Sequence, residues 1–100
     1  MILYNVTVKV DNDIHEAWLH WLKEEHIADV LGTKKFVEAK VYKILVDDET
    51  DGITYSIQYF AASMEDYFDY IHLHANEMRK KGNALWEGKF VAFRTVLKEV

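Results

Sequence analysis

Lys89-Phe-Val-Ala-Phe-Arg-Thr-Val-Leu-Lys98 is the stretch that decides the fold, because it reads as a strand with two apolar faces. Neighbouring side chains of a strand point to opposite faces of a sheet. The first face carries Phe90, Ala92 and Val96, and the second carries Val91, Phe93 and Leu97. We therefore expect other parts of the structure to cover both faces of this strand.

Three further strands are predicted upstream of this stretch. Residues 2–10 and residues 53–60 each alternate between an apolar set and a more polar set, which is typical of a half-buried strand. Residues 36–46 also read as a strand, although both of its faces mix apolar and charged residues. The acidic run at residues 47–52 ends in glycine and predicts a hairpin loop between the second and third strands.

The first helix follows the first strand and begins with Asp13-x-x-Glu16, which resembles a capping box. Its early apolar stripe includes Trp18 and Trp21. At about 100° per residue, Val30 and its apolar neighbours point almost opposite that stripe. One straight helix cannot bury both sets, so we expect a break over residues 24–26 and a short second helical piece.

The second helix begins at Ser63, with Asp66 three residues further on, and either Gly82 or Gly88 marks its end. The order of elements is therefore β-α-β-β-α-β. This order predicts a ferredoxin-like α+β fold, a four-stranded antiparallel sheet with both helices on one face. We expect residues 1–100 to form a single domain of this kind.

Two helices cover only one face of such a sheet, and the last strand is apolar on the other face as well. The simplest cover for that face is a second copy of the chain. We therefore expect a homodimer that pairs through the helix-free sheet face, in the arrangement of a dimeric α+β barrel.

Composition excludes several classes of function. The net charge of −5 argues against a nucleic-acid partner, which favours a basic patch. The absence of cysteine excludes disulfides, thiolate metal sites and cysteine nucleophiles. No apolar run approaches the roughly 20 residues of a membrane-spanning helix, and the amino terminus lacks the features of a signal peptide. We expect a cytoplasmic protein with no membrane partner.

A row of polar residues on the helix-free face is the clearest candidate for a binding site. Asn5 and Thr7 on the first strand would lie near Ser56 and Gln58 on the third, and Arg94 on the last strand would join them. With Leu3, Phe60 and Phe90 around them, these five residues predict a small-molecule pocket between the sheet and its partner. The alternative interpretation is a hydrogen-bonded polar patch inside a subunit interface.

Among the five histidines, His26 is the one acid–base candidate, because it lies at the expected helix break beside acidic residues. The alternative role is to close the helix end with a partly charged ring. The spacing of the histidines predicts no metal site. Trp86 falls between helix and strand, where it can cap the barrel or shape the mouth of a pocket.

The whole chain resembles domain-of-unknown-function family 4286, a bacterial family that has no assigned activity. The resemblance rests on Met1-Ile-Leu-Tyr-Asn-Val-Thr-Val, Trp21-Leu-Lys-Glu-Glu-His-Ile, Tyr55-Ser-Ile-Gln-Tyr-Phe, Ser63-Met-Glu-Asp-Tyr67 and Gly88-Lys-Phe-Val-Ala-Phe-Arg-Thr95. More loosely, the chain resembles the dimeric α+β barrels, which include cofactor-free monooxygenases and haem-degrading enzymes. Ser63-x-x-x-Tyr67-x-x-Tyr70 is similar to a run in some of them. The chain departs from the haem degraders at Lys80, where their haem-ligating histidine would fall.

Two hypotheses for function follow. The first is a small-molecule-binding protein of the dimeric α+β barrel type, working without a cofactor if it is an enzyme. The second is a non-catalytic module that uses its second sheet face to bind itself or another protein. A well-packed interface without a cavity would favour the second hypothesis.

Overall fold

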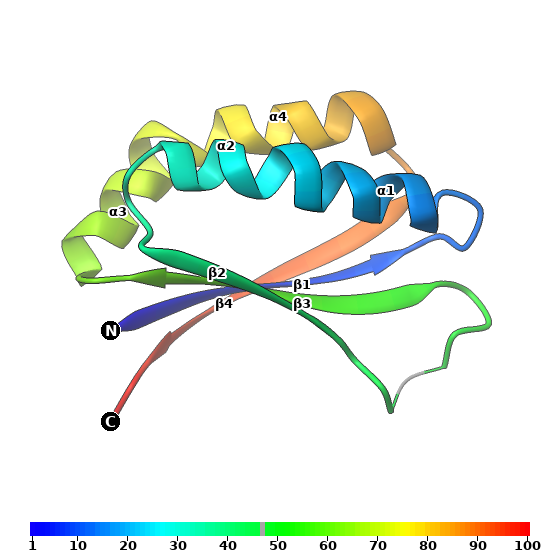
Figure 1. Ribbon diagram of the computed structural model, residues 1–100, viewed down its shortest axis with the longest axis horizontal. Helices are drawn as coiled ribbons and strands as arrows, with labels where there is room; N and C mark the ends of the chain where they lie inside the picture. Colours follow the sequence, from blue (N-terminus) through cyan, green and yellow to red (C-terminus); the bar gives the residue numbers. More distant parts are fainter. Residues whose placement is uncertain (47) are drawn as a thin grey trace.

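The computed structural model describes residues 1–46 and 48–100 and contains one antiparallel sheet with its helices on one side (Figure 1). The sheet has the strand order β2-β3-β1-β4. Its strands are β1 (Ile2–Val10), β2 (Glu38–Lys43), β3 (Ile53–Ala61) and β4 (Phe90–Lys98). The helical segments are α1 (His15–Trp21), a π-helix (Leu22–His26), α2 (Ile27–Gly32), α3 (Met64–Leu73) and α4 (Ala75–Trp86). The predicted ferredoxin-like fold is confirmed.

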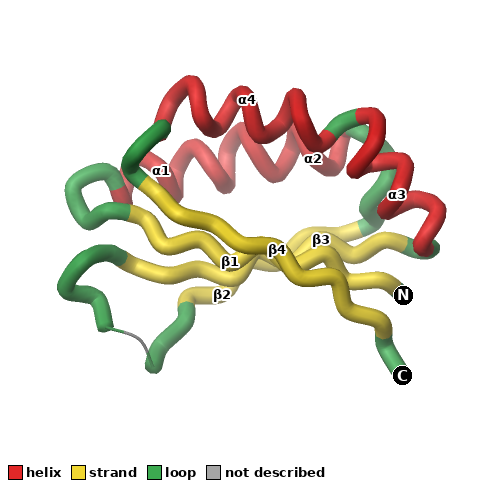
Figure 2. The backbone as a smooth tube through the Cα atoms, turned by 180° about the vertical axis from the view of Figure 1, so that it is seen from behind, coloured by secondary structure: helices red, strands yellow, loops and turns green. Residues whose placement is uncertain are grey.

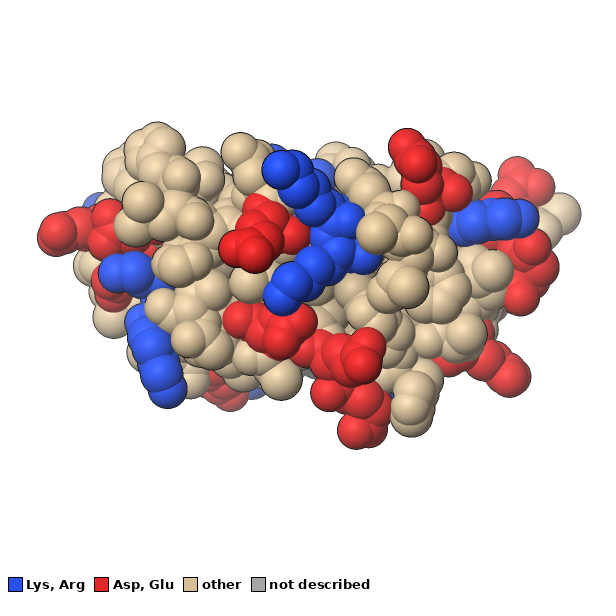
Figure 3. Space-filling model, turned by 90° about the horizontal axis from the view of Figure 1, so that it is seen from above, with Lys and Arg blue, Asp and Glu red and all other residues tan. Residues whose placement is uncertain are grey.

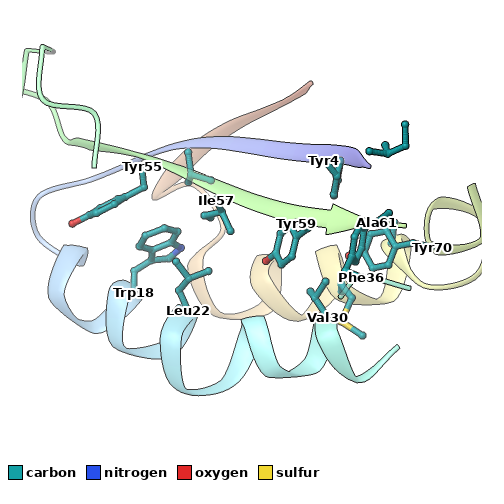
Figure 4. Close-up of a cluster of buried hydrophobic side chains, with 14 of the residues drawn as sticks. Tyr4, Trp18, Leu22, Val30, Phe36, Tyr55, Ile57, Tyr59, Ala61 and Tyr70 are labelled. Atoms are coloured by element: carbon teal, nitrogen blue, oxygen red, sulfur yellow. The ribbon is translucent and has the colours of Figure 1, made fainter. Parts of the chain in front are cut away.

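The register of the strands determines which side chains face the helices. Tyr4 of β1 lies opposite Tyr59 of β3 and Val96 of β4, so these three side chains share one face. The helices cover this face, and the other face of the sheet is bare (Figure 2). Aromatic rings fill much of the layer between sheet and helices (Figure 4). The apolar set predicted for the first strand is therefore the set that packs in the core.

The first helical segment continues through the region where we expected a break. Five residues, Leu22–His26, form a π-helix instead, and α2 follows directly. A π-helix closes hydrogen bonds from residue i to i+5, so its turns are wider than those of an α-helix. The wider turns change the phase of the residues that follow. Leu22 and Val30 are consequently both buried without any interruption of the helix.

The second helical segment is two helices joined at His74, whose backbone departs from helical geometry (φ −128°, ψ −32°). Ser63 is the N-cap of α3, as predicted, and its hydroxyl accepts a hydrogen bond from the Asp66 backbone N–H at 3.1 Å. Gly88 follows the end of α4 with a φ of +79°, the left-handed conformation that favours glycine. Gly82 lies within α4, so Gly88 marks the exit.

The β2–β3 hairpin is present, although β2 is shorter than the expected strand at residues 36–46. Phe36 is buried in the core before β2 begins, and the backbone N–H of the next residue, Val37, already donates to the Phe60 carbonyl of β3 at 2.8 Å. Gly52 precedes β3 and lies against the Val10 backbone, where the Cβ atom of any other residue would clash with the Val10 carbonyl oxygen. Only glycine permits that approach. Asp47 of the predicted loop lies outside the described residues.

The two sides of the molecule differ in character. On the helix side, acidic and basic side chains are interspersed among uncharged ones (Figure 3). On the helix-free side, β4 presents Val91 and Phe93 with 69% and 63% of their surface exposed. None of the helices in the described part of the chain has the length and apolar character needed to cross a membrane.

Candidate ligand-binding site

A cavity of about 230 Å³ lies between the sheet and the helices, on the side opposite to the predicted pocket. We call it the helix-side cavity. Strands β1, β3 and β4 form its floor, and the π-helix and α4 contribute its walls. Its lining includes all three tryptophans of the chain, both of its arginines and one histidine: Trp18, Trp21, Trp86, Arg79, Arg94 and His26.

Two buried polar atoms of this lining have no hydrogen-bond partner in the described part of the chain. They are Nδ1 of His26 and Nε1 of Trp86. Buried polar atoms are nearly always hydrogen-bonded, because leaving one unpaired costs about 1–3 kcal/mol. Both atoms belong to residues that line one cavity, which marks it as a candidate binding site.

The π-helix is what brings His26 to the cavity. The imidazole stacks on Trp21 of the preceding turn, with ring centroids 4.6 Å apart and planes 22° apart. Trp21 in turn meets Trp86 of α4 edge-on at 6.1 Å. This chain of ring contacts fixes the orientation of both rings that carry the unpaired atoms. Functional sites frequently contain such π-helical segments.

Burial lowers the pKa of His26 from 6.5 to about 4; the charge of Asp29 opposes this effect and the charge of Lys81 adds to it. The imidazole is therefore neutral at neutral pH. One of its ring nitrogens then carries a proton and the other accepts hydrogen bonds. The same burial that keeps the ring neutral makes it a weaker base than a solvent-exposed histidine, because it disfavours the protonated form. The role of His26 as an acid–base residue stays a prediction.

We expect His26 to make stability depend on pH. Because its folded-state pKa lies below its unfolded value, the unfolded chain binds the proton more tightly between pH 4 and 6.5. The contribution of the neutral His26 ring to the free energy of unfolding is complete above pH 6.5 and is lost as the pH falls towards 4. Between about pH 7.5 and about pH 4.5 the wild type should lose about 2.5 kcal/mol more than His26→Phe. Urea unfolding of both proteins at the two pH values measures this, and equal losses would contradict it.

Arg79 of α4 and Arg94 of β4 are the solvent-exposed charged residues of the cavity lining, and we call the side that they occupy the mouth of the cavity. Arg79 of α4 donates a long hydrogen bond to the Tyr4 hydroxyl, at 3.4 Å. Arg94 of β4 lies opposite Val6 of β1 in the register, on the helix side of the sheet. Burial raises the pKa of Tyr70, and the nearby Tyr4 adds to this effect. The positive charges of Arg79 and Arg94 lower the same pKa. Both guanidinium groups therefore lie near the same tyrosine.

The structure brings together four of the five residues predicted to bind a ligand. Gln58 Nε2 donates to Ser56 Oγ at 3.3 Å, Ser56 Oγ donates to Asn5 Oδ1 at 2.6 Å, and Asn5 Nδ2 donates to Thr7 Oγ1 at 3.0 Å. We call these four residues the polar row. Because its members hydrogen-bond to one another, the row is the kind of patch that an interface can cover without loss.

Arg94 and Phe90 are not part of the polar row, contrary to the sequence-based expectation. The register of β4 against β1 places both of them on the helix side, where they line the helix-side cavity. Their strand is apolar on both faces, so alternation alone does not tell which face the helices cover. Arg79 was not among the predicted site residues, because a basic run such as residues 79–81 is usual on a solvated helix face; in the structure the run lies within α4.

The alternative role expected for His26, to close the end of a helix, does not apply, because α2 follows the π-helix directly after His26. Within residues 1–46 and 48–100, no group of three or more histidine or acidic side chains is placed to hold a metal ion. His15 instead hydrogen-bonds to the hydroxyl of Tyr55, on which it stacks.

The family model of a domain of unknown function, DUF4286, matches residues 1–100. The chain belongs to this family. None of the curated protein sequences compared with this DUF4286 chain matches it.

Solved structures share its fold. An Arabidopsis thaliana protein has a TM-score of 0.73 at 12% identity, with 100% of this chain and 96% of that one covered. A dimeric ferredoxin-like protein from an uncultured marine organism has a TM-score of 0.69 at 10% identity, with 99% and 97% covered. A Streptomyces coelicolor monooxygenase in complex with Nanaomycin D has a TM-score of 0.62 at 14% identity, with 99% and 88% covered. At these identities the likeness establishes the fold of the DUF4286 chain.

Proposed function

We propose that this protein binds a small planar molecule in the helix-side cavity. The observation that carries the proposal is the pair of buried, unpartnered polar atoms, Nδ1 of His26 and Nε1 of Trp86, on the wall of one cavity. Mostly apolar walls with a few convergent polar groups are the usual character of a small-molecule site. The Streptomyces coelicolor neighbour, which was solved with a small-molecule ligand, lends support from the same fold.

The lining indicates the chemistry of the ligand. Tryptophan and tyrosine rings favour a flat, apolar molecule that can stack against them. The indole N–H of Trp86 can only donate, so the ligand needs an acceptor such as a carbonyl oxygen. A cavity of about 150 Å³ is enough for benzene. The larger helix-side cavity, at about 230 Å³, fits a substituted ring.

If the protein catalyses a cofactor-independent reaction in this cavity, His26 is the residue proposed to take part in proton transfer. His26 lines the cavity, its lowered pKa of about 4 leaves the ring neutral at neutral pH, and its Nδ1 is buried without a partner in the described part of the chain. A reaction in this cavity that removes an acidic proton from the ligand would use His26 as a weak acceptor, whose pKa suits an operating pH not far above 4.

The test compares this cavity with the polar row, which remains the rival ligand site. We expect indanone, a planar ketone, to bind the wild type, and Trp86→Phe to weaken binding about tenfold by removing one buried hydrogen bond. The double variant Asn5→Ala with Gln58→Ala is the matched control on the other sheet face. Ligand-observed NMR provides the dissociation constants.

The two sites give opposite results in this experiment. Unchanged binding by the double variant, together with weaker binding by Trp86→Phe, supports the helix-side cavity. The reverse pattern would assign the ligand to the polar row. If indanone and a panel of related flat ketones fail to bind the wild type, the proposed function is wrong.

A second function is favoured by the exposed apolar residues of β4. We propose that the helix-free sheet face binds a second copy of this chain, with the polar row inside the interface. Contiguous exposed apolar surface on a soluble protein commonly marks such a contact. The neighbour described as a dimeric ferredoxin-like protein supports this assembly. Binding a ligand and forming a dimer use opposite faces of the sheet, so the two proposals are compatible.

A further inference from the structure

The chain has two arginines, Arg79 and Arg94, and both line the helix-side cavity. They come from different elements, α4 and β4, and the fold brings both to the lining of one cavity. In a chain with a net charge of −5, both arginines line one cavity and both are exposed to solvent. Such an arrangement favours an anion there.

Neither arginine forms an ion pair in the part of the chain that the structure describes, although carboxylates are plentiful. Lysines pair with them instead: Lys35 with Asp69, Lys40 with Glu38, Lys43 with Glu49, Lys81 with Asp29 and Lys89 with Asp13. The long bond from Arg79 to the Tyr4 hydroxyl uses one of the five N–H donors of a guanidinium. Most donors of both arginines are therefore available to a ligand.

We propose that the helix-side cavity takes an aromatic carboxylate, with its carboxylate held at the mouth by Arg79 and Arg94. This inference rests on the proposed small-molecule function and specifies its ligand class. The planar guanidinium matches a carboxylate through two parallel hydrogen bonds, and these bonds are about twice as strong as neutral ones. The ring lies among the tryptophans, where stacking and burial stabilise it.

The experiment uses para-nitrobenzoate and para-nitrobenzamide, which have the same size and differ in charge. The nitroaromatic ring quenches indole fluorescence, and all three tryptophans line the cavity, so intrinsic fluorescence reports binding directly. We expect the carboxylate to bind the wild type about tenfold more tightly than the amide. Arg79→Gln and Arg94→Gln should each reduce that preference, and added salt should reduce it in the wild type.

Lys80→Gln is the matched control. It removes the same charge from the same helix, one residue from Arg79, and its side chain does not line the cavity. Preference for the carboxylate that survives Lys80→Gln but falls in both arginine variants supports the inference.

The failures are distinguishable. If carboxylate and amide bind equally well, the cavity binds ligands but the arginines do not select an anion, and only this inference is overturned. If all three substitutions reduce the preference equally, the effect is one of overall charge, and the inference is again wrong. If neither compound binds, and indanone does not bind either, the proposed function falls with it.

Discussion

Replacing Leu22 by alanine should lower the free energy of unfolding by about 3 kcal/mol. Leu22 is among the largest fully buried side chains, with 1% of its surface exposed. It is also the first residue of the π-helix and part of the cavity wall. Truncation removes buried methyl groups and leaves a void that the surrounding rings cannot fill without moving. Urea unfolding monitored by circular dichroism measures the change.

Leu85→Ala is the control for this substitution. Leu85 is on α4 with 57% of its surface exposed, so the same truncation should cost less than about 0.5 kcal/mol. Similar losses in the two variants would show that Leu22 is not packed as described. The π-helical route by which the first helical segment buries both of its apolar sets would then be wrong.

Replacing Phe93 by lysine should weaken the proposed homodimer at least about a hundredfold, because each interface would bury two unpaired charges. Phe93 lies opposite Thr7 of the polar row, on the edge strand β4 of the helix-free face. The Phe93 side chain is 63% exposed in the single chain, and its neighbours Val91 and Leu97 are exposed as well. Sedimentation velocity over a range of protein concentrations measures the dimer dissociation constant.

The control for the dimer is Leu85→Lys, which adds the same charge at an exposed leucine on the helix side. It should leave the dissociation constant unchanged. A wild type that is monomeric at every concentration would refute the dimer. A dimer that tolerates Phe93→Lys but not Leu85→Lys would place the contact on the helices instead of on the sheet.

The sequence predicted the fold well because strong periodicity left few alternatives. Alternation in residues 2–10 and 53–60 identified both central strands and their core faces. Trp18 and Val30 would point to different sides of a straight α-helix, yet both are buried. Either a break in the helix or a stretch of wider turns can bring both side chains to one side. The sequence contains no signal that selects between them, and the structure uses a π-helix.

The site was harder to predict, because it depends on strand register and on side-chain partners. Arg94 shares its parity with Phe90 and Ala92, yet a strand that is apolar on both faces does not reveal which face the helices cover. The residues of the polar row were correctly predicted to lie together, because the predicted fold pairs their two strands, β1 and β3. That Trp86 and His26 each keep an unpaired nitrogen is visible only in three dimensions.

The most direct test of the central claim is a nitrogen–proton NMR spectrum of the tryptophan indole groups during a titration with indanone. The three indole resonances are assigned with single Trp→Phe variants. If the helix-side cavity binds the ketone, the Trp86 Nε1–H resonance should move furthest and in a saturable manner, because this donor gains its missing acceptor. If the Trp86 resonance stays in place while backbone resonances of Asn5 and Gln58 shift, the ligand binds on the opposite face and the account is wrong.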